Sequence, residues 1–171
     1  FIIPYLMWFG FIAVAFLYFF FTDVPGFYRL AKFMFTGMTI FLIISTAFPN
    51  GQDLRPMVFE RDNIFVDMVR VLYRADTCTN VFPSLHVFNS ISVCIAVHES
   101  QALKKHRGVT IGTYVLAGLI ILATMFLKQH SVLDVIGACL MACVLYQFVY
   151  AAERKREPRY AKQKGALLQN K

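Results

Sequence analysis

The chain has 171 residues, which would suit one ordinary domain, but 58% of them are hydrophobic and only 16% are charged. A water-soluble fold could not bury so much apolar sequence, so the composition predicts an integral membrane protein whose first partner is the bilayer. The formal net charge of +7 would fit a nucleic-acid-binding protein, but the basic residues lie between apolar blocks, which argues against a nucleic-acid partner.

The first predicted span covers about residues 1–22, because roughly 20 consecutive apolar residues cross a hydrocarbon core. A polar turn around Asp23 and Pro25 follows, and the second predicted span covers about residues 33–48. The sequence opens with Phe1 and not with Met, and we expect a further segment before it.

Residues 49–83 form the one long stretch of mixed polarity, which predicts an extramembrane segment. Five apolar residues recur in it at helical spacing, namely Ile64, Phe65, Met68, Val71 and Leu72. Charged residues fall on the opposite face, namely Asp67, Arg70 and Arg74. The segment from Ile64 to Leu72 is therefore predicted to be an amphipathic helix that lies on the membrane surface and borders the entrance to the site.

Three further spans are predicted at about residues 84–98, 109–127 and 131–150. The first of these three has the weakest signal, because polar residues interrupt a short apolar run. The transmembrane catalytic domain is expected to cover residues 1–151, followed by a basic cytoplasmic tail at residues 152–171. The predicted fold class is an all-α, polytopic transmembrane helix bundle with five visible spans, and six in the full-length protein.

The charge of the predicted loops assigns the two faces of the membrane, because loops separated by an even number of spans share a face. Twelve of the seventeen Lys and Arg residues, including those of the tail, fall on one face. The other five, together with six of the ten acidic residues, fall on the opposite face. The positive-inside rule makes the first face cytoplasmic and places the C-terminus inside the cell.

Three short segments are predicted to meet on the non-cytoplasmic face, namely Gln52–Pro56, Phe82–His86 and Lys128–Asp134. Two of them contain a histidine. Ionisable groups at the edge of a membrane bundle are costly, so they are candidates for a functional site. We therefore expect the candidate site on this face.

His130 and Asp134 are four residues apart at the start of the last span, which places both on one face of a helix. The carboxylate can orient the imidazole, and a histidine held in the correct tautomer is a competent nucleophile toward phosphorus. His86 follows Ser84 at the start of another span, where free backbone N–H groups favour an anion and its ring can protonate a leaving alkoxide. The first pair alone is equally consistent with a structural helix boundary.

Arg55 and Lys128 are predicted to supply positive charge for phosphoryl oxygens, and Arg suits bidentate contact. Each has a structural alternative, because Arg55 could anchor the chain at the interface and Lys128 could extend to the membrane surface. Ser84 is also predicted to bind the substrate phosphate, although it could serve only as a helix cap.

Three motifs in chain order carry a resemblance to a known family: Arg55-Pro56, P-S-L-H at Pro83–His86 and H-S-V-L-D at His130–Asp134. They resemble the three motifs of the type 2 phosphatidic acid phosphatase family. The resemblance implies a metal-independent enzyme without a cofactor, in which His130 becomes a phosphohistidine. Asp134 would be its partner, His86 the general acid and Arg55 a phosphate ligand.

Three departures separate the sequence from that family pattern. Phe48 stands where the first motif has Lys, Leu85 replaces a Gly, and Ala123-Thr124 replaces Ser-Arg. Two phosphate-binding charges are therefore absent, for which Lys128 could compensate as a charge and Gln52 as a neutral donor. The P-S-L-H form and the Lys-Gln-His run also resemble the subgroup that contains inositol phosphorylceramide synthases.

The leading functional prediction is a lipid-phosphate phosphatase that hydrolyses a lipid phosphomonoester or diphosphate on the outer face of the plasma membrane. The alternative is a phospholipid headgroup transferase, of the phosphoinositol or phosphocholine type, that uses the same histidines. A non-catalytic transporter or scaffold would keep the bundle without needing the two histidines together. The oligomeric state stays open.

Overall fold

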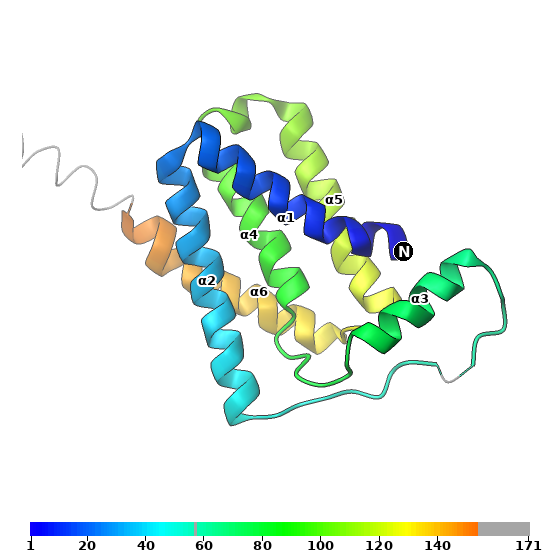
Figure 1. Cartoon of the computed structure of the whole chain (residues 1–171). Helices are drawn as coiled ribbons and strands as arrows, with labels where there is room; N and C mark the ends of the chain where they lie inside the picture. The colour runs from blue at the N-terminus through cyan, green and yellow to red at the C-terminus, as the bar shows by residue number, and fades with distance from the viewer. Residues whose placement is uncertain (57, 154–171) are drawn as a thin grey trace, which may run out of the picture.

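The computed structural model describes residues 1–56 and 58–153, and within these ranges the chain is helical, with no strand. Six α-helices follow one another (Figure 1): α1 (Ile2–Thr22), α2 (Val24–Ala47), α3 (Ile64–Ala75), α4 (Leu85–Glu99), α5 (Arg107–Phe126) and α6 (Val132–Tyr146). A 3-10 turn, η1 (Leu103–Lys105), precedes α5, and a π-helical segment, η2 (Gln147–Ala151), extends α6. Most of the predicted basic tail, from residue 154 onward, lies outside the described residues.

Four helices are long and apolar enough to cross a membrane: α1, α2, α5 and α6 with its extension to Ala151. Many of their large apolar side chains are exposed on the bundle, for example Phe21 at 76% and Leu133 at 70%. Surfaces of this kind are stable next to lipid and not next to water. The chain is therefore an integral membrane protein with an all-helical fold, as its composition predicts.

Helix α4 is the centre of the bundle and contacts all four of these helices. It has only 15 residues, fewer than α1, α2, α5 or the 20-residue segment that α6 forms with its extension. Polar residues interrupt it, but Ser90 and Ser92 are buried and donate to the carbonyls of His86 and Phe88, both at 2.7 Å. Hydrogen bonds within the helix thus satisfy the hydroxyls that weaken the hydropathy of this segment.

Aromatic packing fixes α2 against α4 and η2. The rings of Phe33 and Phe88 are stacked with centroids 5.3 Å apart, and the ring of Tyr150 meets Phe33 edge-on at 5.6 Å. All three side chains are almost fully buried. Gly37 faces the Phe88 ring so closely that a Cβ atom at this position would collide with it. The absence of a side chain at Gly37 therefore sets the separation of α2 and α4.

Helix α2 begins at Val24, well before residue 33, where the second span was predicted to start. The Asp23 side chain accepts a hydrogen bond from the Gly26 amide at 3.0 Å, and Pro25 occupies the first turn. An acidic N-cap followed by proline is the signal for a helix start. The segment predicted as a polar turn is therefore the first part of the helix, and α1 and α2 are joined by one residue.

Helix α3 is the predicted amphipathic helix outside the spans, and Asn63 caps it by accepting from the amides of Phe65 and Val66 at 3.0 and 3.1 Å. One side, centred on Val69, packs against the start of α1 and the end of α5. Part of its apolar surface stays exposed, with Ile64 at 71% and Val71 at 63%. This surface is available to the membrane interface.

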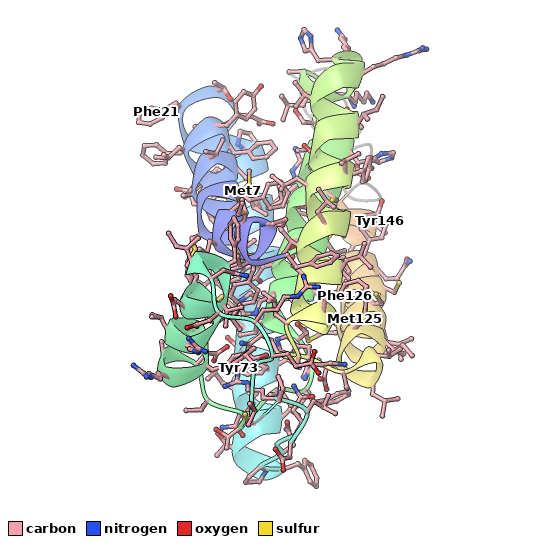
Figure 2. All side chains as sticks on the ribbon, turned by 90° about the vertical axis from the view of Figure 1, so that its right-hand side faces the viewer. Met7, Phe21, Tyr73, Met125, Phe126 and Tyr146 are labelled. Atoms are coloured by element: carbon pink, nitrogen blue, oxygen red, sulfur yellow. The ribbon has the colours of Figure 1, made fainter. Side chains whose placement is uncertain are left out.

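The bundle has two distinct ends. The ends of α2 and α5, the starts of α4 and α6, and the connecting segment with α3 lie at one end (Figure 1). The junction of α1 and α2 and the turn η1 lie at the other end, and Figure 2 shows Phe21 and Tyr73 at these opposite ends. The three segments predicted to form the site all lie at the first end.

Candidate active site

Ser84 starts α4 and ties it to α6. Its hydroxyl accepts from the Val87 amide at 3.4 Å, and its own amide donates to the Asp134 carbonyl at 3.2 Å. The side chain is fully buried, so it acts as the helix cap and not as a surface group. This link places His86, in the first turn of α4, beside the start of α6.

A tight turn after α5 presents His130. The amides of Gln129 and His130 both donate to the Thr124 carbonyl, at 2.9 and 3.2 Å, and Lys128 adopts a left-handed backbone conformation with φ of 53°. Ser131 then starts α6 in a reciprocal cap: its amide donates to the Asp134 carboxylate at 2.6 Å, and its hydroxyl accepts from the Asp134 amide at 3.3 Å. The cap fixes the carboxylate before any ligand binds.

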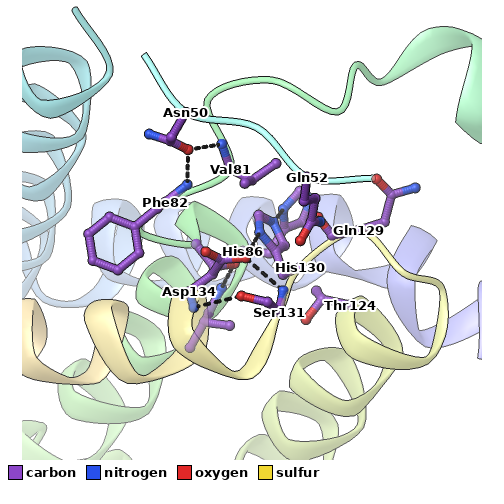
Figure 3. A network of polar contacts seen from close by, with 12 residues as sticks. Asn50, Gln52, Val81, Phe82, His86, Thr124, Gln129, His130, Ser131 and Asp134 are labelled. Atoms are coloured by element: carbon purple, nitrogen blue, oxygen red, sulfur yellow. Dashed lines mark hydrogen bonds and ion pairs between the residues drawn. The ribbon is translucent and has the colours of Figure 1, made fainter. Parts of the chain in front are cut away.

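The two histidines lie side by side in the close view of the site (Figure 3). His130 Nε2 is 3.4 Å from His86 Nδ1, and His130 Nδ1 is 3.7 Å from the Asp134 carboxylate. The side chains of His130 and Asp134 are only 10% and 5% exposed. The expected convergence of the two imidazoles is confirmed, and the carboxylate favours the tautomer with the proton on Nδ1, which leaves the Nε2 lone pair facing His86.

Aromatic residues of α1 cover His86 on another side. The rings of Trp8 and Tyr5 have their centroids 4.3 and 4.9 Å from that of His86. The Tyr5 hydroxyl donates to the Asp76 carboxylate at 3.3 Å. Helix α1, which carries none of the three motifs, therefore contributes to the wall of the site.

The connecting segment is held over the histidines by backbone contacts. The Asn50 side chain accepts from the amides of Val81 and Phe82, both at 2.9 Å, as Figure 3 shows. The Gln52 amide donates to the Cys78 carbonyl at 3.0 Å, next to a bridge between Gly51 and Thr79. These bonds bring the first and second motifs to the same place.

Gln129 joins the first motif to the third, and the sequence analysis did not single it out. Its side-chain oxygen accepts from Arg55 Nη2, and its carbonyl accepts from the Gln52 side chain. Gln129 is 2% exposed, and its Nε2 donor has no partner. Because the side-chain oxygen of Gln129 accepts from Arg55, the Nε2 group of the same side chain points away from Arg55. The Lys-Gln-His run contained this residue, but its contacts depend on the fold.

Arg55 is held from three directions. Its Nη1 donates to the carbonyls of Tyr73 and Asp76 at 3.2 and 2.6 Å, and its guanidinium lies over the Tyr73 ring at 4.6 Å. Partial burial raises the pKa of Tyr73, so the hydroxyl stays protonated and donates to the Leu127 carbonyl at 2.9 Å. Most of the guanidinium is therefore occupied by the protein itself.

A cavity of about 170 Å³ opens beside the histidines. Its lining comes from α2, the connecting segment, α4 and the turn after α5: Phe41, Asp76, Thr77, Thr79, Asn80, Val81, Leu85, His86, Gln129 and His130. Neither Arg55 nor Lys128 lines it, and Lys128 is exposed. Gln52 reaches Gln129 but not the cavity wall.

Two of the three departures from the family motifs lie at positions where the family has a cation. Phe48 is 74% exposed and does not line the cavity. Thr124 is fully buried, and its hydroxyl donates to the Ile121 carbonyl of its own helix at 2.7 Å. Neither position supplies a charge, so the described part of the site contains fewer cations than the motifs of the family would provide.

The fold and the site define a class, an integral membrane helical protein with two apposed histidines and a carboxylate at one end of the bundle. Comparison with family models then gives the family: residues 51–158, more than half of the chain, match the PAP2 superfamily. The chain belongs to that superfamily and is therefore a membrane phosphatase-type enzyme. No curated protein and no solved structure matches the chain.

Proposed function

We propose that this protein cleaves a phosphoester of a membrane lipid through a phosphohistidine on His130. The observation that carries the proposal is the geometry of His86, His130 and Asp134, in which one imidazole nitrogen faces the second histidine and the other faces the carboxylate. A nucleophile, a proton donor and an orienting group are the minimum set for this chemistry. No metal is needed in this scheme.

The first step forms one bond and breaks one. The Nε2 lone pair of His130 attacks phosphorus, and the bond from phosphorus to the lipid oxygen breaks. That oxygen takes the Nδ1 proton of His86, which enters the step as an imidazolium and leaves it neutral. Asp134 stabilises the positive charge that develops on the His130 ring. Because the two imidazoles are in contact, the phosphoryl group has to separate them as it enters from the cavity.

The phosphoryl oxygens are stabilised by neutral donors in this proposal. The free Nε2 donor of Gln129 is the nearest such group in sequence to His130, and Arg55 positions it through the hydrogen bond to the amide oxygen. Backbone N–H groups at the start of α4 add to it. Arg55 thereby acts as a positioning residue, and Lys128 and Ser84 as structural ones.

The second step decides between two candidate activities. When water attacks the phosphohistidine, the enzyme is a lipid-phosphate phosphatase. When the hydroxyl of a second lipid attacks it, the enzyme is a headgroup transferase. In both cases His86 accepts the proton of the attacking oxygen, and the bond from phosphorus to Nε2 breaks. The small number of cations in the described site favours the transferase, whose phosphodiester substrate carries less charge than a phosphomonoester.

The site is proposed to face the non-cytoplasmic side, with α4 as a fifth crossing of the membrane. Arg29 and Lys32 of α2 and the basic residues of η1 lie at the end of the bundle opposite the histidines. Lys32 pairs with Glu153 at 3.3 Å, so the start of the tail reaches the same end. The positive-inside rule assigns that end to the cytoplasm.

The test compares two substrates that differ only in their leaving group, an alkyl alcohol and a nitrophenol. His130→Ala should abolish turnover of both, because a nucleophile is needed for each. His86→Ala should lose much less with the nitrophenol, which leaves without a proton. Initial rates of the purified protein in detergent measure both effects. Full activity of His130→Ala on either substrate would overturn the phosphohistidine.

A further inference from the structure

The cavity beside the histidines is larger than a phosphoryl group needs, and polar residues of the connecting segment line part of its wall. Its volume is about 170 Å³, and the connecting segment contributes Asp76, Thr77, Thr79 and Asn80 to it. The proposed phosphoryl group needs only the part next to His86 and His130. The remaining volume is available to a substituent on phosphorus.

The charge of this wall is negative. Asp76 is its carboxylate, and no described Lys or Arg side chain lines the cavity. Within the described residues Asp76 forms no ion pair, and the partner of its carboxylate is the neutral Tyr5 hydroxyl at 3.3 Å. Arg55 donates to the Asp76 carbonyl and not to its carboxylate. A phosphomonoester dianion placed here would be repelled by the carboxylate.

An aromatic ring in the cavity wall suits a cation. Phe41 lines the same cavity as Asp76. Tyr5 does not line it, but its hydroxyl holds the Asp76 carboxylate and its ring packs against His86. A carboxylate together with aromatic rings stabilises a partly desolvated ammonium group through its charge and through the electrons of the rings. Thr77, Thr79 and Asn80 can accept the hydrogen bonds of its N–H groups.

We propose that this cavity is a subsite for the ammonium headgroup of a phosphodiester lipid, with Asp76 as the residue that selects it. The proposal rests on the phosphoryl-transfer function above. The headgroup stays bonded to phosphorus, and so enters the cavity, while the lipid alcohol leaves beside His86 with the proton of that ring. The substrate class is a zwitterionic phospholipid with an ethanolamine-type headgroup, and not a phosphomonoester.

The test measures kcat/KM of the purified full chain in detergent for phosphatidylethanolamine, phosphatidate and phosphatidylinositol with the same acyl chains. The unsubstituted protein should prefer phosphatidylethanolamine. Asp76→Asn should reduce that preference over phosphatidate about tenfold or more, the usual effect of a hydrogen bond to a charged group. A preference for phosphatidate or phosphatidylinositol in the unsubstituted protein would overturn the subsite.

Two controls separate charge from structure. Asp53→Asn removes an exposed carboxylate of the same segment and should leave the preference unchanged. Tyr5→Phe removes the hydrogen bond to Asp76 but keeps the charge, so the preference should persist. An equal loss for all three lipids in Asp76→Asn would assign this residue a structural role and contradict the proposal.

A binding measurement separates this proposal from the proposed reaction. Calorimetry with phosphoethanolamine and with inorganic phosphate needs no turnover and can use the His130→Ala variant. Tighter binding of phosphoethanolamine that is lost in Asp76→Asn would support the subsite even if the reaction were different. Equal or weaker binding of phosphoethanolamine would overturn the subsite, whereas lipid turnover by His130→Ala would contradict the phosphohistidine alone.

Discussion

Gln129 has a buried side-chain donor with no acceptor, an arrangement that costs free energy unless a ligand completes it. Gln129→Leu should lower kcat about 100-fold, the usual loss for one donor to a developing oxyanion. Gln129→Glu should be at least as harmful, because it replaces the donor with a negative charge. Steady-state kinetics measures both, and unchanged kcat in Gln129→Leu would exclude a role for the amide in the reaction.

Asp134 has two functions that substitution can separate. It faces His130 Nδ1 and also accepts from the Ser131 amide in the cap of α6. Asp134→Asn should lower kcat by about two to four orders of magnitude, because the ring loses the group that sets its tautomer. Ser131→Ala is the matched control, since loss of the cap should cost only about 1 kcal/mol of stability. A comparable loss of kcat in both variants would indicate a purely structural carboxylate.

The residues of the site differ in how far the sequence could predict them. His86, His130 and Asp134 were accessible because the motifs place each of them near a helix start. The expectation that His130 and Asp134 share one helical face was wrong, because α6 begins only at Val132 and His130 lies in the turn before it. The contacts of the surrounding residues could not be predicted from the sequence. Gln129 contacts Arg55 across 74 positions of sequence, and Tyr5 contacts Asp76 across 71. Such pairs depend on tertiary contacts. The same reason explains why Lys128, close to His130 in sequence, lies outside the cavity.

At the scale of the helices, the apolar blocks predicted how many helices there are better than they predicted where each helix begins and ends. The amphipathic pattern was sufficient to predict helix α3, because one face of this helix is apolar and the other is charged. The start of α2 was predicted too late, because Asp and Pro are common in turns as well as at helix starts. Only the helical conformation of the residues after Asp23 shows that this residue is an N-cap. The short α4 had a weak signal, because a helix enclosed by four others can contain buried hydroxyls that a lipid-facing helix cannot.

The contact of α2 with α4 can be tested at Gly37. An added Cβ would collide with the buried Phe88 ring, so Gly37→Ala should destabilise the bundle by about 1–3 kcal/mol despite the better helix propensity of Ala. Thermal unfolding in detergent measures the change. Gly118→Ala on α5, where no atom lies within 4 Å of the new Cβ, should be neutral or slightly stabilising. Equal midpoints for the two variants would contradict the proposed packing.

For the whole molecule, the two ends of the bundle have different chemistry. The end with the histidines carries the extramembrane helix α3, whose exposed Ile64 and Val71 can enter the interface. The opposite end carries Arg29, Lys32 and the basic turn η1. The basic end supports the proposed cytoplasmic placement, whereas an interfacial helix is compatible with either face of the membrane. Helix α4 runs through the centre of the bundle from one end to the other.

The proposed orientation predicts opposite accessibility for two positions that flank α4. Cys78 lies in the connecting segment at the end with the histidines, and Lys105 is exposed in η1 at the other end. In intact cells a membrane-impermeant maleimide should label Cys78. It should label Lys105→Cys, in a Cys78→Ser background, only after permeabilisation. Cys143, exposed on the lipid-facing side of α6, should resist the reagent in both conditions. Labelling of both positions from the same side would show that α4 does not cross the membrane, and the assignment of the active-site face would fall with it.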